Sequence, residues 1–221
     1  KKYQNTTLPR ALSLFIGNIE AARQGVRRLE NQLDYNRVWS ADAEANAAEH
    51  RMTRKVVKIM MQRGVFASID IHNNSGLNPH YACINRLDDT FLHLATMFSR
   101  IVVHFTNPKV VQSEAFAHLC PAVTLECGKP GGIGGIEHAA AFVEGALHLS
   151  SFPAHPVPKH DLNLFHSVAV VTVPEAISLS VGASSSDLCL EENIDHYNFR
   201  ELEPGTRLGF VSDTNLMPLR A

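Results

Sequence analysis

Two stretches of the sequence place polar side chains at the ends of runs that otherwise have the pattern of buried strands. In "VFASIDIH" the residues alternate between two faces, and Asp70 and His72 share one of them before the turn-forming letters NNSG. In "AVTLECG" an apolar run leads to Glu126. The carboxyl ends of strands border the functional crevice of an open α/β sheet, so these side chains are candidates for chemistry.

A third stretch, "QLDYNRVW" at 32–39, carries Asn36 and Arg37 in a polar loop. A guanidinium beside an amide holds a substrate carboxylate through a two-pronged, charge-assisted contact that lysine cannot copy. Together with a histidine that ligates a metal and a glutamate that acts as a general base, this pair would provide the residues needed for metal-assisted amide hydrolysis. In that chemistry zinc lowers the pKa of bound water to about 7, and a carboxylate passes the water's proton to the leaving amine.

Each residue alone also has a plainer interpretation. A single histidine at a strand end is often a hydrogen-bonded structural residue, and Glu126 could cap a neighbouring helix. Asp34 and Arg37 could form a surface ion pair. All these groups lie at positions that could border one crevice. Their occurrence together favours the catalytic interpretation.

The elements that must position these residues alternate between strand and helix patterns. An α/β sandwich with a largely parallel or mixed sheet flanked by helices is therefore predicted. The proline-rich stretch at 153–161 predicts a linker, which gives a hydrolase-like domain over 1–156 and a small β-rich domain over 157–221. Strands are predicted at 11–18, 65–72, 79–85, 100–106 and 122–128, and helices at 19–31, 42–63 (ended by Gly64), 88–99, 113–119 and 136–152.

Composition narrows the class of partner. The 221 residues carry a formal charge of −2, so no general basic field attracts nucleic acid or anionic lipid. No apolar run approaches the roughly 20 residues of a membrane span. Four cysteines without CxxC spacing are typical of a reduced, cytoplasmic protein. Composition therefore predicts no nucleic acid and no membrane as partner, and the Asn36–Arg37 pair favours a small-molecule carboxylate.

Three ordered motifs carry a family resemblance. "FIGNIEAARQGVRRLENQLDYNRVW", "SIDIHNNSG" and "VTLECGKPGG" together resemble the succinylglutamate desuccinylase/aspartoacylase family, which belongs to the zinc carboxypeptidase-like group. The resemblance covers roughly residues 11–152 and implies a carboxypeptidase-like fold and a zinc-dependent deacylase of small N-acyl amino acids. In that family a β-rich tail narrows the entrance to small substrates.

The resemblance also implies roles for individual residues. His72 matches a zinc ligand and Glu126 the general base, while Asn36 and Arg37 match the pair that binds the substrate carboxylate. Arg28 matches an arginine that acts on the scissile carbonyl or the substrate, although the adjacent arginine makes this spacing ambiguous.

Two further positions bear on these roles. Tyr35 departs mildly from the family's Asp-Leu-Asn-Arg pattern. Asp70 is either a partner that orients His72 or a structural ion-pairing residue.

The family's first two zinc ligands come from a His-x-x-Glu motif, and none of the twelve histidines here has a glutamate three residues later. The chain starts without methionine, so the remaining ligands are expected upstream of Lys1. A metallocarboxypeptidase stays open as an alternative, and so does a metal-free module that binds an acidic small molecule. His80, His104 and His118 have no spacing that supports ligation.

The glycine-rich stretch 128–135, "GKPGGIGG", lacks the order of a phosphate-binding loop. It predicts a turn that shapes the pocket.

Overall fold

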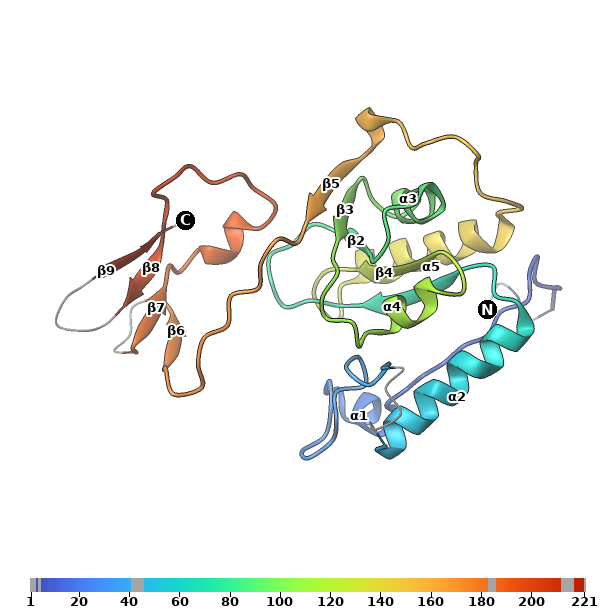
Figure 1. Ribbon diagram of the computed structural model, residues 1–221, viewed down its shortest axis with the longest axis horizontal. Coiled ribbons are helices and arrows are strands. Elements are labelled where there is room, and N and C mark those ends of the chain that lie inside the picture. Colours follow the sequence, from blue (N-terminus) through green and yellow to red (C-terminus); the bar gives the residue numbers. More distant parts are fainter. Residues whose placement is uncertain (1–2, 4, 41–45, 183–185, 212–216, 221) are drawn as a thin grey trace. The chain divides into compact units, whose positions relative to one another are not determined.

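The computed structural model describes residues 3, 5–40, 46–182, 186–211 and 217–220 (Figure 1). Contacts divide the chain into two units. Unit 1 contains residues 1–73, 80–127 and 131–167, and unit 2 contains residues 74–79, 128–130 and 168–221. All the predicted site residues lie in unit 1.

The centre of unit 1 is a five-stranded sheet in the order β1-β4-β2-β3-β5. β1 and β4 are parallel, β2 runs antiparallel to β4, and β3 and β5 run parallel to β2. The mixed sheet predicted from the sequence is therefore confirmed. Its strands are β1 (Ser68–His72), β2 (Tyr81–Ile84), β3 (Ile101–His104), β4 (Ala122–Glu126) and β5 (Asn163–His166).

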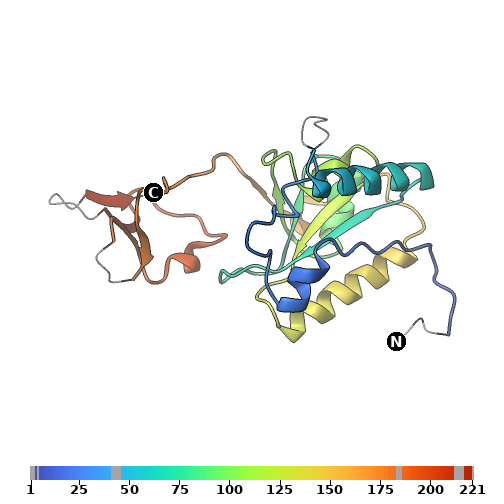
Figure 2. The same ribbon diagram turned by 90° about the horizontal axis from the view of Figure 1, so that it is seen from below.

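Helices flank this sheet, and Figure 2 shows α2 and α5 on its opposite sides. Gly64 ends α2 in the left-handed conformation, with φ at 69°, as the sequence predicts. The Asp88 side chain caps α3 by accepting a hydrogen bond from the Thr90 backbone N–H. The helices are α1 (Ile19–Gln24), α2 (Ala48–Arg63), α3 (Asp89–Thr96), α4 (Gln112–Ala117) and α5 (Ile133–His148). The predicted start of the second helix, at 42, lies outside the described residues.

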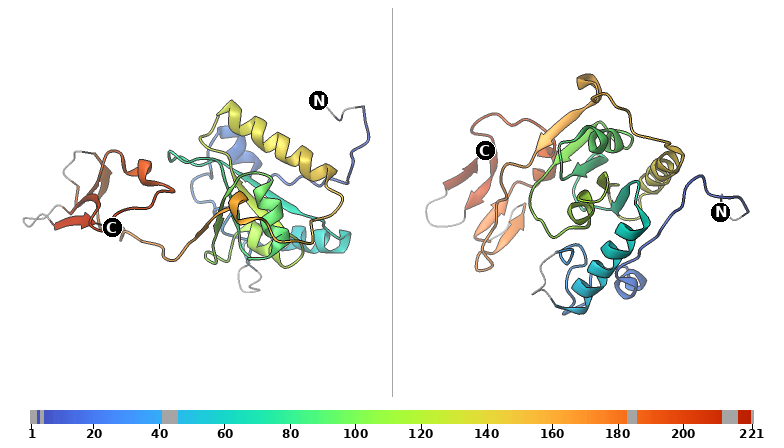
Figure 3. Two further views of the ribbon diagram at one scale, coloured as in Figure 1. Left: turned by 90° about the horizontal axis from the view of Figure 1, so that it is seen from above. Right: turned by 45° about the vertical axis from the view of Figure 1, so that its right-hand side comes forward.

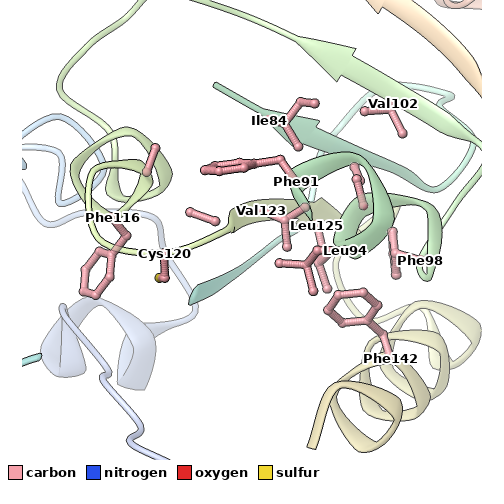
Figure 4. Packing of buried hydrophobic residues seen from close by; sticks show 14 of the residues in the cluster. Ile84, Phe91, Leu94, Phe98, Val102, Phe116, Cys120, Val123, Leu125 and Phe142 are labelled. Carbon is pink, nitrogen blue, oxygen red and sulfur yellow. The ribbon is translucent and has the colours of Figure 1, made fainter. Parts of the chain in front are cut away.

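The core joins the sheet to the helices through apolar side chains (Figure 4). Ile84 and Leu125 of the sheet and Leu94 of α3 are fully buried. Phe98 follows α3 and meets Phe142 of α5 edge to face, with ring centroids 5.7 Å apart. Burying a side chain of this size contributes about 1.5 to 3 kcal/mol, so this cluster fixes the strands that carry the site.

The strand predicted at 11–18 is wrong. This stretch is irregular, and Leu14 and Ile16 are 84% and 68% exposed. A strand is held by hydrogen bonds to a neighbouring strand, and none of the described strands pairs with this segment. Phe15 is held instead by an edge-on contact with Trp39.

Unit 2 contains a four-stranded sheet, β6 (Leu179–Val181), β7 (Leu188–Leu190), β8 (Arg207–Val211) and β9 (Met217–Arg220), drawn in orange and red in Figure 3. This is the β-rich C-terminal character that the sequence predicts. β5 belongs to the sheet of unit 1, and the contacts separate the units after Ser167. The predicted domain boundary at 156/157 stays a prediction.

Short 3-10 helices cover Lys159–Asp161 in unit 1 and Ile194–Tyr197 in unit 2. Over the part of the chain that the structure describes, no helix is both long and apolar enough to cross a membrane.

Candidate functional site

The carboxyl ends of β1 and β4 bring two of the predicted residues together. The strands are parallel neighbours, and their register places His72 opposite Glu126. The His72 Nδ1 atom lies 3.8 Å from Glu126 Oε1, and the two side chains are 20% and 15% exposed. Directly paired residues project to the same face of a sheet, so the register alone fixes this contact.

Asp70 lies two residues before His72 on the same face of β1. Its Oδ2 atom is 2.9 Å from His72 Nε2. A neutral imidazole that donates its Nε2 proton to Asp70 keeps a lone pair on Nδ1, on the side of Glu126. Burial alone would lower the pKa of His72, but the hydrogen bond and charge of Asp70 and the charge of Glu126 raise it above its ordinary value.

The loop after α1 brings Asn36 to the same place. The carboxylate of Asp34 accepts hydrogen bonds from the Asn36 backbone N–H, at 2.9 Å, and from the Arg27 guanidinium, at 2.7 and 3.1 Å. The Asn36 side chain accepts a hydrogen bond from the Gln112 backbone N–H at 3.1 Å, and its Nδ2 atom lies 3.3 Å from His72 Nε2. Asn36 therefore links the loop to α4 and lies beside the imidazole of His72.

The three arginines of this loop have different hydrogen-bond partners. The exposed guanidinium of Arg28 donates to the Gln32 carbonyl, and that of Arg37 donates to the Asn36 carbonyl. Arg27, the residue next to Arg28, is the one whose charge acts on His72 and opposes its protonation. The roles of Arg28 and Arg37 stay predictions. Sequence spacing could not separate Arg27 from Arg28, and only the pairing with Asp34 does so.

Tyr81 is a neighbour of the site that the sequence did not reveal. It is the first residue of β2, and the antiparallel register places it opposite Glu126. Burial, and then the charge of Glu126, raises the pKa of the Tyr81 phenol, so the phenol stays protonated at neutral pH. Sequence alone could not find Tyr81, because the antiparallel insertion of β2 between β4 and β3 is a tertiary feature.

The glycine-rich stretch holds the end of β4 by close packing. A Cβ atom at Gly135, in the first turn of α5, would lie 2.1 Å from the Cys127 carbonyl oxygen. Gly131 has a φ of 80°, which glycine adopts without strain. Gly135 therefore packs directly against the backbone that follows Glu126.

Metal-ligating residues are sparse in this region. Among the described residues, no three histidine, cysteine, aspartate or glutamate side chains gather to hold a metal ion. A catalytic zinc site takes three protein ligands, and His72 supplies one imidazole. The residues described here therefore do not fit a complete zinc site. The other histidines considered have partners elsewhere: His80 contacts His138, His104 contacts His166, and His118 contacts Glu114.

Comparison with solved structures identifies the fold. A succinylglutamate desuccinylase from Vibrio parahaemolyticus superimposes with a TM-score of 0.62 at 14% identity, over 93% of this chain and 62% of that one. The chain has the succinylglutamate desuccinylase fold. The enzyme of the same name from Chromobacterium violaceum gives a TM-score of 0.55 at 18% identity, over 73% of this chain and 59% of that one. A mutant of murine aminoacylase 3 gives 0.58 at 12% identity, over 93% of this chain and 72% of that one.

The resemblance predicted from the three motifs is thus confirmed at the level of the desuccinylase fold. No protein-family model and no curated protein sequence matches the chain. The chain spans 59% and 62% of the lengths of the two bacterial desuccinylases.

Proposed function

We propose that the protein is a deacylase that hydrolyses the amide bond of a small N-acyl amino acid or a related carboxylate. The observation that carries the proposal is the register of β1 and β4, which sets His72 beside Glu126 at the sheet edge, with Asn36 against the same imidazole. The desuccinylase fold supports this class of reaction, since the neighbours in that fold are named for the removal of acyl groups.

Glu126 is the proposed general base. Its carboxylate takes a proton from the attacking water and returns that proton to the nitrogen of the leaving amine, which cleaves the amide bond. Its low exposure, 15%, is consistent with a carboxylate shielded from bulk water.

Asn36 and Arg37 are the proposed carboxylate-binding pair, and Arg28 is proposed to act on the substrate. Arg27 adds a positive charge that is held on the Asp34 carboxylate. Three guanidinium groups on this one loop suit a substrate that carries carboxylates.

The family resemblance implies a zinc-dependent enzyme. Of that implication, the proposal keeps only the role of His72 as a metal ligand. Because the described residues supply one imidazole, no catalytic step is assigned to a metal. The lone pair on Nδ1 and the Asp70 contact on Nε2 are the arrangement of a metal-ligating histidine whose orientation is fixed by a carboxylate.

The experiment uses protein expressed from the complete coding sequence, with Glu126→Ala, His72→Ala and the control Glu137→Ala on the exposed face of α5. Metal content is measured by elemental analysis, and hydrolysis is measured with N-succinylglutamate and a panel of N-acyl amino acids. We expect hydrolysis in the parent protein and the Glu137 variant only, and we expect His72→Ala to hold less zinc than the parent protein. Absence of both zinc and hydrolysis from the parent protein would contradict the proposal.

A metal-free binding module is the second candidate, and the single imidazole at the site favours it. In this case Asn36, Arg37 and the neighbouring arginines would bind an acidic small molecule without cleaving it. Calorimetric binding of N-succinylglutamate without metal or turnover would support this candidate over the deacylase.

A further inference from the structure

A cavity of about 540 Å³ lies in unit 1 between α2 and α4, away from the contacts that assemble His72, Glu126 and Asn36. Its volume falls in the range of roughly 300 to 1,000 Å³ that is usual for small-molecule sites. Figure 1 shows the two helices that form its walls, α2 in cyan and α4 in green. The segment that follows Arg37 closes it with Trp39.

The interior of the cavity is apolar. Trp39, Val57, Met61 and Ala115 line it. Trp39 is held rigidly, since its ring meets Phe116 edge to face with centroids 6.0 Å apart. The buried Thr53 hydroxyl donates to the Val38 carbonyl at 2.8 Å, so this lining group is satisfied within the protein. An apolar body of a ligand would therefore displace water from apolar walls without stranding a polar group.

The charged residues of the lining are mostly positive. Arg54 and Lys58 lie one turn apart on α2, and Lys109 approaches from the segment before α4. In the described part of the chain, Lys58 and Lys109 make no hydrogen bond or ion pair with any residue. The one acid, Glu114, lies 3.7 Å from His118, which also lines the cavity.

We propose that this cavity binds a small amphipathic anion, such as a medium-chain fatty acid or an aromatic carboxylate. The apolar body would lie against Trp39 and Val57, and the anionic head would lie between Lys58 and Lys109. An anion there is attracted by both ammonium groups, one on α2 and one on the segment before α4. Neither a cation nor a neutral apolar molecule gains this interaction.

The cavity is connected to the proposed catalytic residues through two segments of the chain. Trp39 follows Arg37 by two residues, and Gln112, which donates to Asn36, belongs to the helix that carries Glu114 and Ala115. The binding itself does not depend on the proposed deacylase activity.

The test uses the fluorescence of Trp39, the single tryptophan of the chain. The full chain is titrated with 8-anilinonaphthalene-1-sulfonate, an apolar anion that accepts energy from tryptophan, and then with octanoate or octanol as competitor. The variants are Lys58→Gln, Lys109→Gln and their combination, with Lys55→Gln on α2 as the matched control outside the cavity. These exposed lysines are not part of the core, so we expect all variants to fold.

We expect saturable quenching of Trp39, and a dissociation constant that rises at least about tenfold in the double variant, or about 1.4 kcal/mol, while Lys55→Gln matches the parent. Octanoate should compete far better than octanol. Equal binding by the double variant and the control would overturn the proposal, because the probe would then sit elsewhere, for example on the exposed 11–16 stretch. Equal competition by octanol, or no saturable signal, would also overturn it. Glu126→Ala should bind the probe unchanged, so failure here is separable from failure of the deacylase proposal.

Discussion

The strand ends and the loop after α1 both supply residues to the candidate site, but they position them by different means. His72 and Glu126 are placed by the ladder between β1 and β4, which is fixed by a buried core. Asn36 and Arg27 are placed by a few hydrogen bonds to one carboxylate, Asp34. Strand pairing that is supported by a buried core should keep its register when a single surface residue is substituted. The conformation of the loop depends instead on individual polar contacts.

Removing the base at the strand end should have the largest effect. Glu126→Gln keeps the shape of the side chain but removes the proton acceptor, so the deacylase rate should fall about 10²- to 10⁴-fold. Thermal unfolding should change little, since the strand register does not depend on the charge. The rate is measured with the N-acyl amino acid that the protein cleaves best, with Glu137→Gln as control. A variant that retains most of its activity would exclude Glu126 as the base.

Disturbing the support of the strand end should destabilise the protein. In Gly135→Ala the new methyl group would meet the Cys127 carbonyl, and overpacking of this kind costs about 1 to 3 kcal/mol. Gly134→Ala is the matched control in the same helix turn, because nothing lies within 4 Å of its Cβ position. Since alanine favours a helix over glycine by up to about 1 kcal/mol, the control should be neutral or stabilising. The stabilities of the two variants are compared by urea unfolding. Equal midpoints would contradict the close packing of Gly135 against Cys127.

Removing Asp70, the hydrogen-bond partner of His72, tests what orients the imidazole without disturbing the pairing of β1 with β4. In Asp70→Ala the imidazole loses a hydrogen bond whose net value is about 0.5 to 1.5 kcal/mol, or more when the imidazole is charged. The pKa of His72 should fall, because Asp70 is the main group that raises it. A pH titration of the imidazole by NMR, in parent and variant, measures this. An unchanged midpoint would show that Asp70 does not set the protonation of His72.

The smallest effect is expected in the loop. The Arg27–Asp34 pair is largely exposed at its arginine end, and such pairs contribute about 0 to 1 kcal/mol. Partial burial would raise the pKa of Asp34, but the hydrogen bonds from Asn36 and Arg27 lower it below its ordinary value. The stability that the ionised Asp34 carboxylate contributes to the fold is therefore present above a pH of about 4. It is lost as the pH falls through the lowered pKa of this carboxylate.

The stability difference between the parent and Asp34→Asn should accordingly shrink in acid. Urea unfolding at pH 7 and pH 3 measures it. A difference that grows towards acid would contradict the sign of this linkage. If the Asn36 turn also loosens, the Michaelis constant for an acidic substrate should rise in Asp34→Asn while the strand-end residues keep their stability.

The sequence by itself determined the alternating α/β order, the end of α2 at Gly64 and the placement of His72 and Glu126 at strand ends. These features are local: a left-handed glycine ends a helix, and period-two alternation assigns faces of a strand. The three motifs also predicted the desuccinylase fold, which the chain shares with solved structures that are only 12% to 18% identical to it.

The tertiary structure decided which of these residues meet. It set β1 beside β4 in register, inserted β2 antiparallel so that Tyr81 faces Glu126, and selected Arg27 rather than Arg28 for Asp34. None of the strands in the described part of the chain pairs with the apolar 11–18 stretch, although its composition alone predicted a strand. Strand formation and side-chain contact both depend on a neighbour that is distant in sequence, and apolar composition or spacing along the chain does not specify that neighbour.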